Sequence, residues 1–399
     1  MEGTASRTRI HFQVDGLPLQ SHAVQAREGL NQVSRWRIHC AASHDLDSLA
    51  LLGKQAELEV IGGDGLSRTV RGLITRVDYQ DDLPDARQGH FVFELQAGLS
   101  RLAQQQRWRL VQQQRTPELI TALLNEYQIA VDNRLSMDYP VHSWLLQGGE
   151  TDLDWLQRLL AEEGIGFYST SNEHGETVVL FDRPTAVDRA GRRAIAVIRD
   201  SGGVQQIGQQ QIGVLTTVHA WYKQVPQRVV AHIQRNPTEG HPPVIAVGAL
   251  QAAETLQETL YLGGHPDAAE ARRRASLRLE YWQGCRHGVS VSGPVADLAP
   301  GQLLDVQGVG TCLVESATLR YGEPDDHLGI SAQALLWEAQ LKPVGQPWRP
   351  TVPPRPDLPE VFPARVESTG AYSELDGLGR RDGPAAELGQ LPAMRAAFQ

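Results

Sequence analysis

The segment TDLDWLQRLLAEEGIGFY, residues 151–168, decides how the rest of the chain is interpreted. It combines four carboxylates, a tryptophan and recurring leucines with two later glycines, a pattern typical of a helix, a stop and a strand. Thr151 is the expected helix cap, with Asp154 three residues later, and Gly164 is the expected left-handed stop. The leucines and Trp155 predict one apolar face. The question is whether the acids do chemistry.

The four acids are predicted to be structural. Residues two apart on a helix point in directions about 200° apart, so Asp152 and Asp154 do not share a metal ion while they are helical. Both lie at the helix N-terminus, where negative charge is favourable. Glu162 and Glu163 lie at the opposite end, where the dipole disfavours anions, so we expect them to face water or a basic residue of a neighbouring chain. For these four acids we therefore favour roles in helix capping, solvent exposure or subunit contact over a role in catalysis.

Composition and charge narrow the class of protein. The chain has 399 residues, 41% of them apolar, which is enough for two or three domains with their own cores. It carries 47 acidic and 37 basic residues, a formal charge of -10, which argues against a nucleic-acid partner. Cys40, Cys285 and Cys312 are odd in number and lack CxxC spacing, so neither a disulfide framework nor a structural zinc site is predicted.

Targeting signals are also not expected. The N-terminus lacks the apolar core of a secretory signal peptide, and the apolar runs are far shorter than the roughly 20 residues of a bilayer-spanning helix. The sequence therefore predicts no signal peptide and no integral membrane segment.

The first hundred residues alternate between polar and apolar positions in short segments. These segments, at 9–16, 33–40, 55–65, 68–80 and 90–96, are separated by turn signals and predict half-buried antiparallel strands. Their number and spacing favour a small barrel or sandwich over a parallel sheet.

The middle of the chain predicts two helices and a hairpin. The glutamine-rich tract 98–116 carries regularly spaced apolar anchors, so we expect an ordered connection rather than low complexity. TPELITALLNEYQI (116–129) predicts an amphipathic helix with Thr116 as its cap and Pro117 at its first position. The strands at 165–169 and 177–181 flank NEHGE and predict a hairpin.

Enzyme motifs are not found. The 13 histidines form no HExxH and no His/Cys metal spacing, and neither GxSxG nor a phosphate loop is present. IGGDG (61–65) and GVGT (308–311) read as hairpin turns. Cys285 and His287 fall on a predicted strand without an orienting acid, which argues against a catalytic pair. The sequence therefore predicts no enzyme, no cofactor and no metal site.

The segment YPVHSWLLQGGETDLDWLQRLLAEEGIGFYSTSNEHGETVVLFDRP (139–184) resembles the most recurrent stretch of the VgrG family. These are tip proteins of the bacterial type VI secretion system, related to phage late control D and tail hub proteins. The residues that match its pattern are Tyr139, Pro140, Gln147, Glu150, Asp152, Asp154, Leu159, Glu162, Glu163, Gly164, Ile165 and Tyr168. The tract before 129 and the segment 274–308 resemble the family in the same order, so the likeness covers residues 8 to about 345.

The resemblance implies a mainly β fold with an α+β insertion and two small β-barrel hub domains of the phage tail hub type. The expected parts are a first barrel (1–100), a mixed insertion (101–188) with helices 116–128 and 152–163 and hairpin 165–181, a second barrel (189–345) with helix 267–281, and a proline-rich linker with a truncated OB-like segment (346–399). It also implies a homotrimer that joins a sixfold tail tube of Hcp type to a threefold spike. The arginine-rich helix is expected to present a solvated or subunit-contacting face.

The C-terminal part departs from the family. Residues 363–381 resemble the first strand and turn of an OB-like barrel, and Asp376, Gly379 and Arg380 fit its Asp-x-x-Gly-Arg motif. The printed sequence stops at Gln399 before further barrel strands. Three interpretations stay open: a hub with a separate spike chain, a truncated tip protein, or a variant whose tail docks another protein.

The resemblance also implies partners and a location. Besides itself and the tail tube, the expected partners are baseplate subunits and a separate spike chain, a PAAR-type tip or an effector. The alternatives are a monomeric adaptor that loads cargo and, less favoured, a baseplate-associated cell-wall hydrolase. Assembly is expected in the bacterial cytoplasm, with export through the machine instead of by a signal peptide. A secretion system, a phage tail and a phage-derived particle fit equally.

Overall fold

The computed structural model divides the chain into two compact units. It describes residues 8–80, 89–173, 175–187, 191–197, 214–233, 244–248, 256–262, 268–322 and 335–355. Unit 1 comprises Met1–Gly98, Ile129–Ser136 and Gly164–Thr351, and unit 2 comprises Leu99–Gln128, Met137–Glu163 and Val352–Gln399. The four-part domain division drawn from the sequence stays a prediction.

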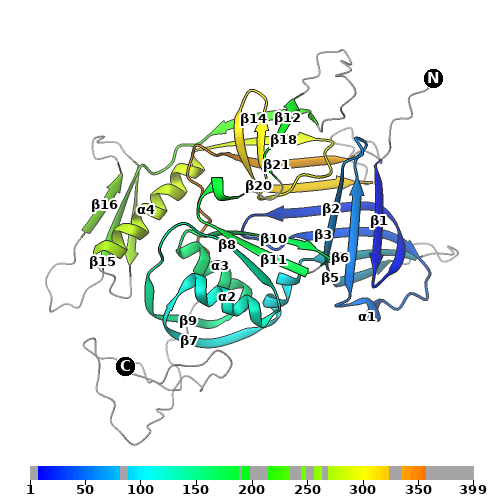
Figure 1. Ribbon diagram of the computed structural model, residues 1–399, viewed down its shortest axis with the longest axis horizontal. Helices are drawn as coiled ribbons and strands as arrows, with labels where there is room; N and C mark the ends of the chain where they lie inside the picture. Colours follow the sequence, from blue (N-terminus) through cyan, green and yellow to red (C-terminus); the bar gives the residue numbers. More distant parts are fainter. Residues whose placement is uncertain are drawn as a thin grey trace, which may run out of the picture. The chain divides into compact units, whose positions relative to one another are not determined.

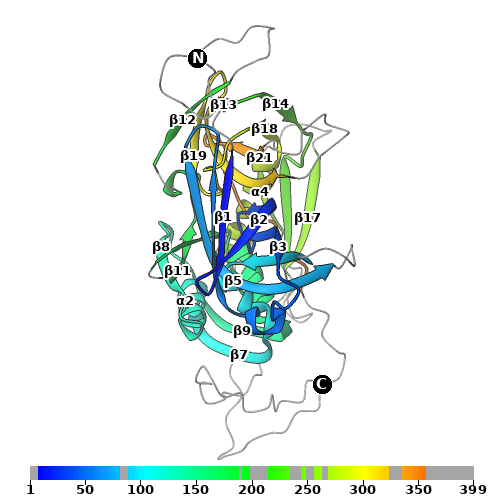
Figure 2. The same ribbon diagram turned by 90° about the vertical axis from the view of Figure 1, so that its right-hand side faces the viewer.

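The first barrel of unit 1 is a closed ring of six antiparallel strands. They are β1 (Arg9–Val14), β2 (Leu17–Gly29), β3 (Arg35–Ala42), β4 (Gln55–Ile61), β5 (Ser67–Gln80) and β6 (Gly89–Gln96). The order is β1-β4-β5-β6-β3-β2, and β1 pairs with β2 to close the ring (Figures 1 and 2). Alternate side chains point inward, and the core includes Phe12, Trp36, Ile38, Leu58 and Phe93. The short helix α1 (Ser48–Leu51) is capped by Asp47.

A second ring follows in the same unit. Its strands are β12 (Arg193–Val197), β13 (Val214–Leu215), β14 (Thr217–Tyr222), β18 (His287–Gly293), β19 (Leu303–Val306), β20 (Gly310–Tyr321) and β21 (Leu336–Pro343). The pairings run β14-β18-β21-β20-β19-β12-β13, and β13 leads through Thr216 into β14, so the path returns to its start. Strands β2 and β20 pair antiparallel and join both rings in one 13-stranded sheet. The predicted mainly β fold with two small barrels is therefore observed.

A small α/β layer extends unit 1. Strands β15 (Arg228–Ile233), β16 (Val244–Gly248) and β17 (Gln257–Leu262) form a three-stranded sheet, and α4 (Ala268–Cys285) lies against it (Figure 1). Ala271 and Ala275 are buried at that contact, because small side chains allow a close approach of helix and sheet. The helix predicted at 267–281 therefore exists but continues to Cys285. The expectation that Cys285 lies on a strand is wrong, since the strand begins only at His287.

The predicted hairpin is confirmed. Strands β10 (Gly166–Asn172) and β11 (Gly175–Phe181) pair antiparallel, and β8 (Ala130–Arg134) adds to β11 in parallel. A 3₁₀ turn (η2, Pro184–Ala186) follows. The turns predicted at 61–65 and 308–311 also connect antiparallel pairs, β4–β5 and β19–β20.

Unit 2 packs two helices on a two-stranded sheet. The elements in chain order are η1 (Gly98–Gln104), β7 (Gln106–Arg115), α2 (Thr116–Glu126), β9 (Val141–Thr151) and α3 (Asp152–Glu162), with β7 and β9 antiparallel. The glutamine-rich tract is therefore ordered, as predicted, and most of it is strand. Helix α2 begins one residue earlier than expected: Arg115 occupies the cap position without a side-chain bond, and Thr116 is helical.

Two further predictions concern the C-terminal OB-like residues and membrane-spanning helices. The OB-like residues Asp376, Gly379 and Arg380 lie outside the described residues. Among the helices that are described, none combines the length and the apolar character needed to cross a bilayer.

Candidate functional site

Asp152 is the centre of a buried polar network in unit 2. Its side chain is fully buried, so its role goes beyond the favourable helix-end charge that the sequence predicts. One carboxylate oxygen accepts from Tyr127 Oη at 2.7 Å and from Arg109 Nη2 at 3.4 Å, and the other accepts from Gln147 Nε2 at 2.8 Å. These donors come from the residue that follows α2, from β7 and from β9. Asp152 therefore ties the sheet and the first helix of unit 2 to α3, which it begins.

The network around Asp152 shifts the pKa values of two of the neighbouring side chains. Burial, reinforced by the hydrogen bond to Asp152, raises the pKa of the Tyr127 hydroxyl, so this group stays a donor. Burial also raises the pKa of Glu126, although Arg107 at 2.9 Å opposes that shift. Arg109 also lies over the Trp155 ring, 5.8 Å from its centroid. Each charge is thus compensated inside the unit.

Asp154 behaves as predicted. Its backbone N–H donates to Thr151 Oγ1 at 3.0 Å, and Thr151 Oγ1 donates in turn to the Asp154 carboxylate at 2.6 Å. The capping pattern read from the sequence is confirmed, because Thr151 has extended backbone angles and its side chain accepts the third N–H of the helix.

Glu150 and Glu162 share one arginine. Arg158 Nε donates to Glu150 at 3.0 Å, Arg158 Nη1 lies 3.4 Å from Glu162, and Arg158 Nη2 donates to the Leu146 carbonyl at 2.8 Å. Arg355 Nε also reaches Glu162 at 3.0 Å. The expectation that Glu162 faces water or a neighbouring chain is therefore wrong in this respect: its partners are basic residues of its own chain.

Glu163 also departs from expectation. Its side chain is buried, and Oε1 lies 3.0 Å from His142 Nε2 on β9. A buried carboxylate at a helix C-terminus needs a local partner, since the dipole there opposes its charge. His142, which the sequence reading did not single out, supplies that partner. Its spacing of 21 residues from Glu163 gives no local signal.

The remaining residues of the stretch are anchors. Tyr139 is buried, its carbonyl accepts from Arg115, and the neighbouring Pro140 is half-buried. Leu159, Ile165 and Tyr168 are buried in apolar surroundings. Gly164 has φ +73°, so the predicted left-handed stop is confirmed, and a Cβ there would lie 2.8 Å from Leu277 Cδ2.

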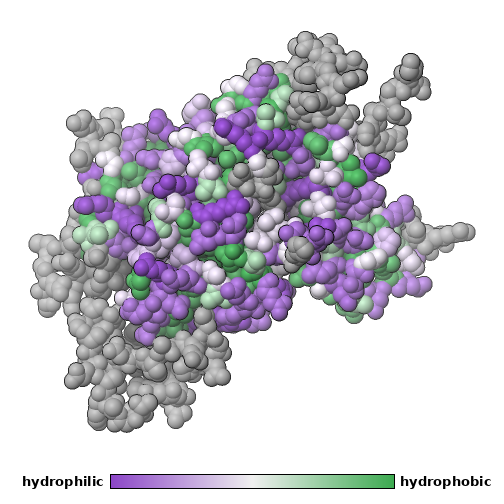
Figure 3. Space-filling model, viewed as in Figure 1, coloured by the Kyte–Doolittle hydropathy of each residue, from purple (hydrophilic) through white to green (hydrophobic). Residues whose placement is uncertain are grey.

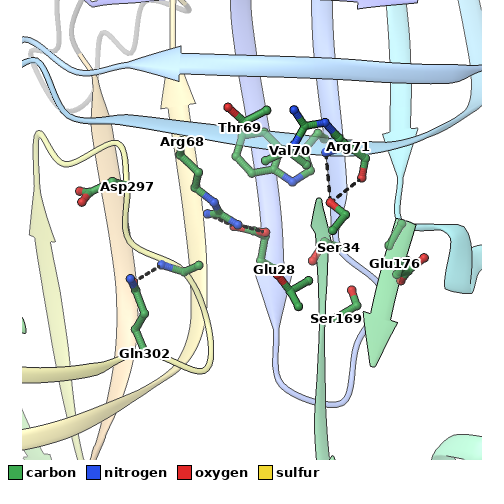
Figure 4. A pocket seen from close by; sticks show the side chains of 15 residues that line it. Glu28, Ser34, Arg68, Thr69, Val70, Arg71, Ser169, Glu176, Asp297 and Gln302 are labelled. Atoms are coloured by element: carbon green, nitrogen blue, oxygen red, sulfur yellow. Dashed lines mark hydrogen bonds and ion pairs between the residues drawn. The ribbon is translucent and has the colours of Figure 1, made fainter. Parts of the chain in front are cut away.

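A second polar site lies in a cavity of unit 1. The cavity has a volume of about 220 Å³ and is lined by β2, β3, β5, the β10–β11 hairpin and the loop before β19. Figure 4 shows Arg68 and Glu28 facing each other on its wall, where Arg68 donates to both Glu28 oxygens at 2.6 and 2.7 Å. Arg68 also donates to the Leu298 carbonyl and lies over the Trp36 ring. Sequence reasoning missed this pair, because its members are 40 residues apart.

Polar groups that line the cavity form hydrogen bonds with one another. Ser171 exchanges hydrogen bonds with the backbone of Arg71 at 3.2 and 3.3 Å. Gln302, labelled in Figure 4, accepts from the Ala299 N–H. Glu28 is neutralised by Arg68 in bidentate geometry. Such groups join strands to loops; they do not present an activated nucleophile or base. We therefore interpret both polar sites as structural.

The arginine-rich face of α4 is mostly paired within the chain. Arg273 and Arg274 bind Glu270, and Arg278 binds Glu258 with two contacts of 2.7 Å. Arg272 is exposed. On the face of the molecule in Figure 3, hydrophilic side chains predominate and hydrophobic areas are small. The exposed large hydrophobics are scattered over several elements, for example Leu49, Tyr222 and Tyr261. Scattered exposure of this kind does not mark a contact surface by itself.

The fold of the chain is shared with solved proteins of a secretion system and of a phage-type tail. It is similar to a solved structure of E. coli c3393, described as a component of the type VI secretion system with similarity to the T4 tail proteins gp27 and gp5; the TM-score is 0.66 at 18% identity, over 93% of this chain and 87% of that one. It is also similar to a tail protein from Neisseria meningitidis MC58, with TM-score 0.61 at 12% identity, over 85% and 98% of the two chains.

The sequence comparison is more specific. The family model described as the phage tail baseplate hub (GPD) matches residues 27–316, and the chain belongs to this family. It is 25% identical to the Pseudomonas aeruginosa spike protein VgrG2a over 79% of this chain and 38% of the relative, and 30% identical to VgrG4b of the same organism over 51% and 25%. The resemblance to VgrG proteins is confirmed, and the chain spans two fifths or less of these relatives.

Proposed function

We propose that the chain is a structural hub of a contractile injection machine, acting as a homotrimer between a sixfold tail tube and a threefold spike. The observation that carries the proposal is the pair of strand rings in unit 1, which β2 and β20 join in one sheet. Three copies of a two-ring chain present six similar rings around a threefold axis. Such an arrangement has one face suited to a sixfold tube and another suited to a trimeric spike.

The buried polar sites support a scaffold rather than an enzyme. Asp152, Glu28 and Glu163 are each held by groups of their own unit, so their charges rigidify the fold. Mechanical load transfer between a tube and a spike requires rigid subunits and no bond chemistry. The proposed partners are a tail tube of Hcp type, baseplate subunits, and a separate spike chain, PAAR-type tip or effector. Assembly is proposed in the bacterial cytoplasm, followed by export through the machine.

Mass measurement in solution tests the proposal. Light scattering of the purified chain should give three times its 43.9 kDa, and electron microscopy of that sample should show a ring with a threefold axis. Adding a hexameric tail-tube protein should give a complex with one trimer per hexamer. A stable monomer that binds no tube would contradict the hub and favour the alternative of an adaptor that loads cargo onto a complete tip protein.

The hydrolase alternative is tested in the same preparation. The hub proposal expects no release of soluble fragments from purified peptidoglycan, with lysozyme as the positive control. Release that disappears in a Glu162→Gln, Glu163→Gln double variant would contradict the structural interpretation of these acids. The double variant should otherwise keep the mass of the parent.

A further inference from the structure

Three histidines gather on the outside of the first barrel. His22 lies on β2, His39 on β3 and His90 on β6, and one ring nitrogen of each lies within 4.8 Å of those of the other two. His39 Nδ1 and His90 Nε2 are 3.3 Å apart. His22 is exposed, whereas His39 and His90 are half-buried. The family match and the hub function do not assign a role to this cluster.

The strand pairing explains why distant residues meet. On β3 and β6, His90 pairs with Ala41, so the short Ala41 side chain leaves the diagonal from His90 to His39 open. On β2 the register slips between Ser21 and Ala23, and Ala23 pairs with His39. His22 is the extra residue of that irregularity. A bulge re-aims its side chain, and here it brings His22 to the same outer face as His39.

The backbone of the bulge in β2 is in close contact with Gly322, which follows β20. A Cβ at Gly322, which has φ +84°, would lie 2.1 Å from the His22 carbonyl oxygen and 2.7 Å from Ala23 Cα. The chain after β20 therefore packs directly on the bulge, as only glycine permits. All three ligand-bearing positions thus belong to paired strands of unit 1, and the cluster is preorganised by the sheet.

The spacing suits a metal ion. With metal–nitrogen bonds of about 2.0–2.1 Å, two ligands of a tetrahedral ion lie about 3.3–3.4 Å apart. The separation of the His39 and His90 nitrogens has this value, and the His22 nitrogen, on an exposed side chain, lies near enough to complete a third corner by a small rotation. Imidazole nitrogens suit zinc, copper and nickel over calcium or magnesium.

We propose that His22, His39 and His90 form a binding site for a divalent transition-metal ion, zinc in the first place, with solvent as the fourth ligand. The proposal is independent of the hub function. The open fourth position follows from the exposure of His22, because the ion would lie at the surface of the barrel and not inside it. The ion would bridge β2, β3 and β6, the three strands that carry the ligands.

The alternative explanation is a packing cluster of three rings, whose centroids are 5.3 to 6.2 Å apart. The two explanations predict different results: a metal site binds one ion per chain and gives a tetrahedral Co²⁺ spectrum, whereas a packing cluster does neither.

The test uses the full chain without a polyhistidine tag. Zn²⁺ titration by calorimetry at pH 7.5 should give one ion per chain, and Co²⁺ should give the intense visible bands of a tetrahedral site. Losing an outer-shell partner of a metal costs about 10- to 100-fold in affinity, so His90→Ala, which removes a ligand, should cost at least about 100-fold. His22→Ala should weaken binding as well without threatening the fold, since its side chain is exposed.

His11→Ala is the matched control, because His11 is an exposed histidine on β1 of the same barrel. It should leave the stoichiometry, affinity and Co²⁺ spectrum unchanged. Far-UV circular dichroism should match the parent for all variants. The proposal is overturned if the parent shows octahedral Co²⁺ spectra or no Zn²⁺ binding, or if His11→Ala weakens binding as much as His22→Ala does.

Discussion

Each compact unit buries a carboxylate against an arginine, but the two carboxylates are held differently. In unit 2, Asp152 is fully buried and accepts from a phenol, an amide and a guanidinium on three other elements. In unit 1, Glu28 meets one arginine in bidentate geometry beside a cavity of about 220 Å³. In unit 2 one buried acid thus joins several elements, whereas the ion pair of unit 1 lies beside the apolar core of the strand rings.

The difference has an energetic reason. Unit 2 has two helices of 11 residues and a two-stranded sheet, so its apolar core is smaller than that of the strand rings in unit 1. A buried polar network in which every donor and acceptor has a partner fixes how the helices and strands of unit 2 pack together. A ring of six strands closes on its own hydrogen bonds and has a large apolar interior, so one ion pair at its edge adds comparatively little. Five experiments test whether the two units differ in this way.

Replacing Asp152 should have the largest effect. Asp152→Ala leaves Arg109, Tyr127 and Gln147 without their shared acceptor in a site with no exposure, and removing one partner of a buried ion pair costs about 3–5 kcal/mol. We expect a loss of this size in urea unfolding of unit 2, followed by tryptophan fluorescence. Asp154→Ala, two residues away and exposed, is the control and should cost much less. Equal losses would mean that Asp152 is only another helix-end charge.

Glu28→Ala should come next. Arg68 keeps the Leu298 carbonyl and the Trp36 ring, and the cavity is wide enough for water, so the expected cost is about 2–3 kcal/mol. The loss should be confined to unit 1, whereas that of Asp152→Ala should be confined to unit 2. The Glu28→Ala, Arg68→Met double variant should recover part of the stability, because it no longer buries an unpaired charge.

Thiol labelling assigns each loss to a unit, because all three cysteines lie in unit 1. Burial raises the pKa of Cys40 to about 12 and that of Cys312 to about 11, so neither presents a thiolate near pH 8. Glu28→Ala should accelerate labelling of both residues in mild urea, and Asp152→Ala should not. Labelling at parental rates in both variants would argue against separate opening of the units.

The two helix caps should differ by a smaller amount. Thr151 caps α3, which has 11 residues and carries the buried Trp155, whereas Asp47 caps the single turn of α1. Thr151→Ala should cost about 1 kcal/mol, the usual value for a lost cap. Asp47→Ala should cost less, since α1 orders only four residues and is more easily replaced by an irregular turn. Chemical denaturation measures both, and a larger loss for Asp47→Ala would reverse the expectation.

The pH dependence should give the smallest effects, with opposite signs in the two units. At Glu258 of unit 1, burial alone would raise the pKa, but hydrogen bonds from Arg278 and Trp282 outweigh it and lower the pKa. Its contribution to stability is therefore present above the unfolded value of 4.5 and is lost as pH falls through the lowered pKa. At Glu126 of unit 2 burial raises the pKa, so its contribution is present below 4.5 and is lost as pH rises.

Gln variants test these signs. The stability difference between the parent and Glu258→Gln should shrink on acidification below pH 4.5. The difference between the parent and Glu126→Gln should instead move in favour of the variant as pH rises from 4.5 to 7. Thermal unfolding across this range measures both, and parallel curves for the two variants would contradict the assignment.

Much of the fold could be predicted from the chain, because its signals are local. Alternation along β1 and along β3 to β6, the Thr151 cap, Gly164 and the hairpin at 165–181 depend on neighbouring residues, and all of them are confirmed. Strand β2 (Leu17–Gly29) was not predicted. Errors arose at element ends. Thr116 is helical where a cap was expected, and Cys285 belongs to a helix where a strand was expected. Capping and helix ends depend on a few tenths of a kcal/mol that tertiary contacts easily override.

The candidate sites were less predictable. Asp152, Glu162 and Glu163 were assigned to caps, solvent or neighbouring chains from their positions on the helix alone. Their partners Tyr127, Arg355 and His142 lie on other elements and were not foreseen. The pair of Glu28 and Arg68 and the three histidines of the barrel gave no spacing signal at all, since strand register and a bulge bring them together.

Periodicity, caps and a recurrent motif depend on residues that are close together in the chain, so most strands and helices and the family could be predicted. Which charges are buried and which histidines lie together became apparent only in the folded protein. Burial and pairing depend on contacts between residues 20 to more than 60 positions apart, for example His142 with Glu163 or His22 with His90. The two strand rings and the network around Asp152 bring residues that are distant in the sequence into contact.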